Sequence, residues 1–261
     1  MSKFQSLSTA VAFLENQMVS EGRSVKPKFW QALDVSARPE AEMRELTFIN
    51  FSAPMPKDLF ELEKETNPHM NWAEDHFQER VAGKPVNPGI TWLAWPWSNS
   101  ADTHRKNQKF SHNYMERYWP KFARDGIKHQ DGIRYPYGDL NDVVELIAKD
   151  PLTRQAYMPV FFPEDTGAVH GERIPCSIGY HFMIREDKLH VVYQLRSCDL
   201  WRHFRDDLYL TVRLAQWIHD ELYFERGISV TLGDIHVNIS SLHLFINDYH
   251  ALTTRLSKES Y

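Results

Sequence analysis

Cysteine is scarce in this sequence, which has only Cys176 and Cys198 among its 261 residues. One bridge between them is possible, but two cysteines make no disulfide framework, and a reducing cytoplasm fits such usage better. Long apolar runs are missing too, because Glu15 and Gln17 interrupt the N-terminal stretch early. We therefore expect a cytoplasmic protein with neither a signal peptide nor a membrane span.

An excess of positive charge is also absent, since the formal net charge is −5. No overall basic field exists to hold a polynucleotide, so we expect no such partner, although a local arginine cluster would suffice for a single nucleotide. The phosphate loops GxGxxG and GxxxxGK[ST] do not occur, and neither do the metal spacings HExxH and CxxC. The sequence therefore predicts no metal site.

What is present is an ordinary globular balance, with 42% apolar and 25% charged residues, and we expect one domain over residues 1–261. Apolar spacing and end signals predict helices in STAVAFLENQM, NPHMNWAEDHFQERVAG, NQKFSHNYMERYWPKFARDG, GDLNDVVELIAKDP and DDLYLTVRLAQWIHDELYFERG. SIGYHFMIREDKLHVVYQLRS predicts two strands joined at REDK, with Ile178, Tyr180, Phe182 and Ile184 on one face. Helices and strands mix without a regular βαβ alternation, which favours an α+β fold.

The stretch RIPCSIGYHF (173–182) places Cys176 at the start of an expected strand. A cysteine there is more often a small buried hydrophobe than a nucleophile. However, LRSCD (195–199) adds Arg196 and Ser197 at a strand end. A guanidinium and a hydroxyl together suit a phosphate, and a nearby cation favours the thiolate, which is the nucleophilic form.

PCSIGYHFMIREDKLHVVYQLRSCD resembles the core of the thymidylate synthase family, which has a Pro-Cys nucleophile, a strand, a turn and an Arg-Ser-x-Asp motif. DPLTRQ (150–155), YG (137–138) and SSLHLF (240–245) are similar to further segments of that family, so the resemblance spans roughly 70–250. It implies a thymidylate synthase-like fold with a mixed or antiparallel sheet packed with helices. It also implies that one sheet face lies at a dimer interface.

Two segments resemble the deoxycytidylate hydroxymethylase branch most closely: NWAEDHFQ and FRDD (204–207). Thymidylate synthases have an asparagine aligned on Asp207, and its amide matches O4 and N3 of uracil. A carboxylate instead accepts from the 4-amino group of cytosine and can share a proton with N3. Asp207 is thus predicted to select cytosine, and Asp206 is the alternative if the alignment slips. Without the resemblance, Asp207 reads as a helix N-terminal acid.

The resemblance implies that the Cys176 thiolate adds to C6 of dCMP and that C5 then attacks the methylene of 5,10-methylenetetrahydrofolate, the co-substrate. Water then gives 5-hydroxymethyl-dCMP. It assigns the nucleotide to Arg196, Ser197, Arg154, Asp207 and His243, proton handling to Glu74 and Tyr137, and the folate pterin to Asp199. Trp95, in a cluster with Trp92 and Trp97, is a further candidate to pack on the pterin. Arg154 would cross to the neighbouring site of a homodimer. Glu74 and Tyr137 otherwise read as a surface glutamate and a core tyrosine, and Trp92, Trp95 and Trp97 as packing residues.

The sequence departs from the family pattern at Gln155, Ser177, His181, His203 and Phe245. Gln155 replaces a second arginine, and Phe245 replaces a tyrosine that helps to bind the sugar. We expect a dCMP hydroxymethylase of a phage, located in the host cytoplasm, or of another system that modifies DNA. The alternatives are a methyltransferase that makes 5-methyl-dCMP or dTMP, including one that acts on dUMP, and a catalytically silent nucleotide-binding protein.

Overall fold

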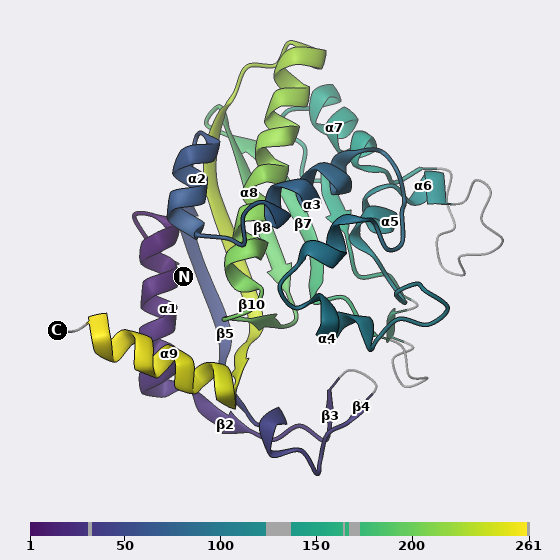
Figure 1. The fold of residues 1–261 in the computed structure, drawn as a ribbon. Helices are drawn as coiled ribbons and strands as arrows, with labels where there is room; N and C mark the ends of the chain where they lie inside the picture. Colours follow the sequence, from purple (N-terminus) through teal and green to yellow (C-terminus); the bar gives the residue numbers. More distant parts are fainter. Residues whose placement is uncertain (31–32, 124–136, 164, 167–172, 260–261) are drawn as a thin grey trace.

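The computed structural model describes residues 1–30, 33–123, 137–163, 165–166 and 173–259 (Figure 1). Its main sheet runs β1-β5-β10-β8-β7-β6 within this part of the chain, with β2 on β5 and β9 on β10. The strands are β1 (Ser2–Lys3), β2 (Arg23–Val25), β5 (Met43–Pro54), β6 (Tyr157–Pro159), β7 (Ser177–Arg185), β8 (Lys188–Leu195), β9 (Cys198–Asp199) and β10 (Thr231–Phe245). β10 is antiparallel to β5 and parallel to β8 and β9. This mixed sheet with its helices confirms the predicted α+β class.

Helices occur largely where apolar spacing predicts them. They are α1 (Leu7–Glu21), α2 (Leu59–Thr66), α3 (Trp72–Val81), α4 (Ser98–Asp102), α5 (Tyr114–Tyr118), α6 (Pro120–Ala123), α7 (Leu140–Lys149), α8 (Phe204–Asp220) and α9 (Ile246–Glu259). Short turns of helix are η1 (Pro39–Ala41), η2 (Thr91–Ala94) and the π-helical η4 (Glu221–Glu225), and β3 (Phe29–Trp30) pairs with β4 (Leu33–Asp34). None of the described helices has the length and apolar character that a membrane crossing requires.

The helix predicted over NQKFSHNYMERYWPKFARDG is shorter than expected. Asn107 and Gln108 have positive φ angles, and helix α5 begins only after Asn113, whose side chain accepts from the Met115 amide. The end of the predicted helix lies outside the described residues. The stretch therefore begins as a turn. The helix starts after Asn113 because an asparagine side chain there caps a free backbone amide of the first helical turn.

Helix α8 lies over one face of the sheet (Figure 1). It packs on β8 and β10, and α2 and α3 pack on it in turn. Leu208, Val212 and Ala215 are buried in one cluster with Tyr193 and Val237. Each large side chain buried in this way contributes roughly 1.5–3 kcal/mol, so this packing fixes where the first turn of α8 sits.

The β7–β8 hairpin turns at Glu186 and Asp187, both at positive φ, which confirms the turn predicted at REDK. A bulge between Ser177 and Gly179 interrupts its register. Ser177 and Tyr180 are three positions apart and would point to opposite faces of a regular strand, but the extra residue lets both of them face the core. Ile178 is left only partly buried. The prediction that Ile178 shares the buried face of Tyr180 is therefore wrong.

Candidate active site

The hairpin brings Cys176 and the Arg196–Ser197 pair together. Cys176 immediately precedes β7, Arg196 immediately follows β8, and the Arg196 amide donates to the Cys176 carbonyl at 2.9 Å. The Ser197 hydroxyl lies 3.7 Å from the Cys176 sulfur, and the Arg196 Nη2 lies 4.0 Å from it. Cys176 is partly accessible, whereas Cys198 is buried, and both are free thiols.

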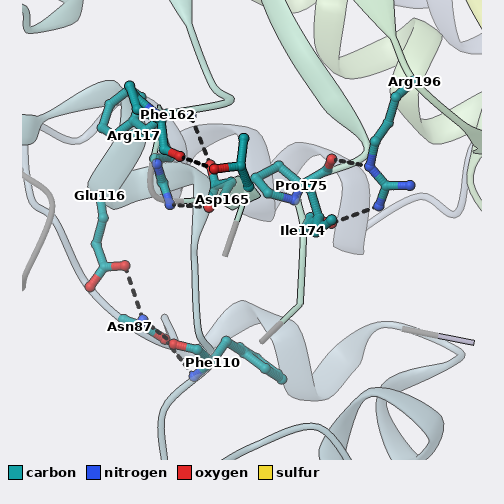
Figure 2. A network of polar contacts seen from close by, with 11 residues as sticks. Asn87, Phe110, Glu116, Arg117, Phe162, Asp165, Ile174, Pro175 and Arg196 are labelled. Carbon is teal, nitrogen blue, oxygen red and sulfur yellow. Dashed lines mark hydrogen bonds and ion pairs between the residues drawn. The ribbon is translucent and has the colours of Figure 1, made fainter. Parts of the chain in front are cut away.

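Arg196 also holds the loop that carries the thiol. Its Nε donates to the Pro175 carbonyl and its Nη2 to the Ile174 carbonyl, each at 2.8 Å (Figure 2). A third donor, Nη1, points to the Ser197 hydroxyl at 3.2 Å. The planar guanidinium makes these contacts at fixed angles, so one side chain positions both the cysteine loop and the serine.

Asp207 forms another wall of the site, from the first turn of α8. Its Oδ2 lies 3.5 Å from the Cys198 sulfur. Burial raises the pKa of Asp207 to about 7; the Arg80 guanidinium opposes the shift, and the charge of Asp206 adds to it. A carboxyl with this pKa is protonated in a large share of molecules near neutral pH. It can therefore both donate and accept a hydrogen bond.

Tyr114, which the sequence did not indicate, lies within electrostatic range of both Asp207 and Cys176. Its hydroxyl lies 2.9 Å from the Ser177 hydroxyl, which lies 2.6 Å from the Tyr193 hydroxyl. Burial raises the pKa of Tyr114 well above its ordinary value, and the neighbouring Asp207 and Cys176 raise it further. Nothing in the sequence distinguishes Tyr114 from the ten other tyrosines, because its place depends on packing between distant segments.

Glu74 has partners elsewhere. Both of its oxygens accept from Arg213, through Nε and Nη2 at 2.9 Å, and the Tyr209 hydroxyl donates to it at 2.7 Å. Burial opposes ionisation, but the hydrogen bonds from Arg213 and Tyr209 outweigh it and hold the pKa of Glu74 below its ordinary value. Glu74 thus ties α3 to α8, and its predicted catalytic role stays a prediction.

Tyr137 is 62% exposed and directly follows residues 124–136, which lie outside the described part of the chain. Its role in C5 deprotonation therefore stays a prediction. Arg154 is also exposed, and its carbonyl is 3.1 Å from His181 Nε2. This contact gives His181 a structural purpose, since it holds the Arg154 segment against β7. Ser177 has a structural role as well, because its hydroxyl contacts those of Tyr114 and Tyr193.

Asp199, Trp95 and His243 lie around the turn that leads into α8. Asp199 Oδ1 accepts from the Trp201 and Arg202 amides, each at 2.9 Å, and burial raises its pKa to about 6. His243 pairs with Asp199 between β10 and β9, and burial lowers the pKa of His243 to about 4. Asp199 therefore shapes the turn, and its second oxygen is 3.9 Å from Arg202 Nε.

Tryptophan and histidine rings gather beside this turn. Trp95 stacks on His203 with ring centroids 4.7 Å apart, and Trp72 lies 5.9 Å from Trp95. The indole nitrogens of Trp72, Trp95 and Trp97 are buried without a hydrogen-bond acceptor in the described structure. Buried donors normally have a partner, so three unsatisfied indole N–H groups are unusual, and the predicted role of Trp95 in holding the folate stays a prediction.

Metal-capable side chains gather elsewhere, at His190, Asp234 and His236, whose ligand atoms lie within 4.8 Å of one another. His190 Nδ1 accepts from the Asp234 amide, and the Asp234 carboxylate is 3.2 Å from the Lys3 ammonium. These contacts already engage two of the three groups. The sequence prediction that no metal is used stays a prediction.

Comparison with known proteins found no matching family model. The "Deoxyuridylate hydroxymethyltransferase" of Bacillus phage SP01 is 30% identical over 136 residues, which are 49% of this chain and 33% of that protein. A "Putative thymidylate synthase" of Methanosarcina mazei is 26% identical over 142 residues, which are 54% of this chain and 56% of that protein. The chain thus spans about a third and about half of these relatives.

The mixed sheet packed with helices is compatible with a thymidylate synthase-like fold. The names of the two relatives support a thymidylate synthase-like family with a hydroxymethylase branch, as the sequence resemblance predicted.

Proposed function

We propose that this protein is a folate-dependent C5 hydroxymethylase that converts dCMP and 5,10-methylenetetrahydrofolate into 5-hydroxymethyl-dCMP. The observation that carries the proposal is the position of Cys176, partly accessible and within 4.0 Å of both Ser197 and Arg196. The hydroxymethyltransferase name of the phage relative supports the type of reaction. Because that name specifies deoxyuridylate, dUMP is the alternative substrate.

The chemistry assigned to the chain begins at Cys176. Its thiolate forms a bond to C6, and the electron pair of the C5–C6 double bond moves toward C5. A protonated Asp207 can donate to N3 of cytosine while its other oxygen accepts from the 4-amino group, which makes C6 more electrophilic. Arg196 and Ser197 hold the phosphate, and His243 contacts the sugar.

The folate supplies the one-carbon unit when bound, and Trp95 and Asp199 are the residues proposed to hold its pterin. After C5 gains the carbon, it must lose its proton. Tyr114 is one candidate for this task, because its hydroxyl contacts that of Ser177, the neighbour of Cys176 in the chain. Tyr137 is the candidate from the sequence resemblance. Loss of that proton and departure of tetrahydrofolate leave an exocyclic methylene on C5. Water adds to this carbon, the C5–C6 double bond forms again, and the Cys176 thiolate leaves C6.

We also propose that the active form is a homodimer in which Arg154 reaches the phosphate of the neighbouring site. The exposure of Arg154 in the single chain supports this arrangement. The burial pattern of β7 and β8 supports a dimer as well, because buried residues largely alternate with residues that are only partly buried. A half-covered sheet face suits a second copy of the chain.

The test is an incubation of the protein with 5-tritiated dCMP or dUMP and methylenetetrahydrofolate. We expect tritium release from dCMP, a hydroxymethyl product by mass spectrometry and no absorbance of dihydrofolate. Cys176→Ser should abolish release. Turnover of dUMP alone would reject the base assignment, and dihydrofolate formation would indicate methylation. Nucleotide binding without any tritium release would indicate the silent binding protein.

A further inference from the structure

Arg173 stands three residues before Cys176 and carries no role in the function proposed above. Its Nε is buried and has no acceptor among the described residues. The nearest ring in cation–π range is Phe110, with the guanidinium carbon 5.9 Å from the centroid, which is a long contact. The residue as a whole is partly buried, and a buried N–H of a charged group without an acceptor is costly, so the position calls for a ligand or a counter-ion.

Three arginines converge beside this loop. His112 lies among Arg173, Arg117 and Arg196, and burial together with their positive charges lowers its pKa well below the ordinary value. Arg117 is neutralised, because its Nη2 donates to Asp165 at 3.0 Å and both side chains are buried (Figure 2). The positive charge beside the loop therefore comes from Arg173 and Arg196.

Neither Arg173 nor Arg196 has a carboxylate partner in the part of the chain that the structure describes. Arg196 gives two donors to backbone carbonyls, which are neutral acceptors. Burial and the repulsion from Arg196 both lower the pKa of Arg173, while Cys176 and Tyr114 are the groups that act in the opposite direction. Two mutually repelling cations beside a thiol and a hydroxyl form a site that lacks its anion.

We propose that Arg173 is a second guanidinium of the nucleotide phosphate site and replaces, within the same chain, the arginine that Gln155 lacks. This inference rests on the proposed function. A phosphate monoester carries up to two negative charges and three acceptor oxygens, and two guanidinium groups and a hydroxyl can satisfy these together. Arg196, Ser197 and Arg173 are that set, arranged around the Cys176 loop.

The experiment separates the phosphate from the rest of the nucleotide. Dissociation constants for dCMP, deoxycytidine and inorganic phosphate are measured by calorimetry on the wild type, Arg173→Gln and Arg173→Lys. Arg226→Gln is the matched control, because Arg226 is an exposed arginine that pairs with Glu145 on α7. We expect Arg173→Gln to weaken dCMP and phosphate binding about tenfold to hundredfold, with deoxycytidine unchanged. Arg173→Lys should lose less, and Arg226→Gln nothing.

Equal weakening of dCMP and deoxycytidine, or a loss confined to the affinity for folate, would overturn the assignment of Arg173 while leaving the proposed function in place. Phosphate binding that depends on Arg173, in a wild type that binds neither dCMP nor dUMP, would keep the anion site and reject the nucleotide function. Should Arg173→Gln fail to fold, the same comparison rests on Arg173→Lys, for which unchanged dCMP affinity rejects the proposal.

Discussion

Asp206 and Asp207 are adjacent in sequence, but their carboxylates contact different parts of the molecule. Asp206 accepts from the His69 amide at 2.8 Å and lies 2.9 Å from His69 Nδ1, which fixes it to the loop before α3. Asp207 instead lies against Cys198 and acts electrostatically on Tyr114, as Cys176 does. This difference makes Asp207 rather than Asp206 the candidate for reading the base.

We expect Asp207→Asn to shift substrate preference from dCMP toward dUMP, because an amide matches O4 and N3 of uracil. The ratio of kcat/KM values for the two nucleotides should change by roughly tenfold to a hundredfold, the size of one or two exchanged hydrogen bonds. Steady-state kinetics with both substrates measure it. Asp206→Asn is the control: it should lower stability through the lost His69 contacts and leave the ratio unchanged.

The raised pKa of Asp207 predicts a pH-dependent stability difference. The carboxyl titrates at about 7 in the folded protein and near 4 when unfolded. Its contribution to stability is therefore complete below about pH 4 and is lost as the pH rises through about 7. We expect Asp207→Asn to exceed the wild type in stability at pH 8, by on the order of 2–4 kcal/mol, and to lose this advantage toward pH 4. Urea unfolding across this range measures it, and a constant difference would contradict the prediction.

Mixed dimers test whether Arg154 acts across subunits. We expect Arg154→Ala and Cys176→Ser each to be nearly inactive alone. When the two variants are unfolded together and refolded, half of the dimers are mixed, and each mixed dimer has one intact site. Activity should then recover to about a quarter of that of the wild type. No recovery from a sample that sedimentation shows to be dimeric would place Arg154 in its own site or in none.

The contacts of Glu74 predict a loss of stability on substitution. In Glu74→Gln, the Arg213 guanidinium loses a half-buried carboxylate, and we expect a cost of about 1–3 kcal/mol in the free energy of unfolding, measured by urea unfolding. Glu145→Gln is the control, since its exposed pair with Arg226 should contribute about 0.5 kcal/mol or less. An unchanged free energy of unfolding in Glu74→Gln would contradict this prediction. Tritium release at a temperature where both variants are folded tests the catalytic role separately, and a loss in Glu74→Gln alone would support that role.

The sequence was sufficient where the connection is local. The Cys176–Arg196 pair follows from a hairpin whose two strands and tight turn are visible in the alternation of residues. It was not sufficient for Tyr114 or Arg173, because their neighbours come from segments far apart in the chain. The bulge at Ser177 also escaped prediction, since strict alternation contains no sign of an inserted residue.

Arg196 donates to the Ile174 and Pro175 carbonyls and thereby combines two roles that usually fall to different residues, namely ligand binding and positioning of the nucleophile. The side chain proposed to bind the phosphate also sets the position of the loop that presents the thiol. We therefore expect a substrate without phosphate to react more slowly as well as to bind more weakly, because a bound phosphate adds contacts that hold the Arg196 guanidinium and, through it, the cysteine loop. Deoxycytidine would then stay a slow substrate even at saturating concentration, because no bound phosphate would help to position the Cys176 sulfur.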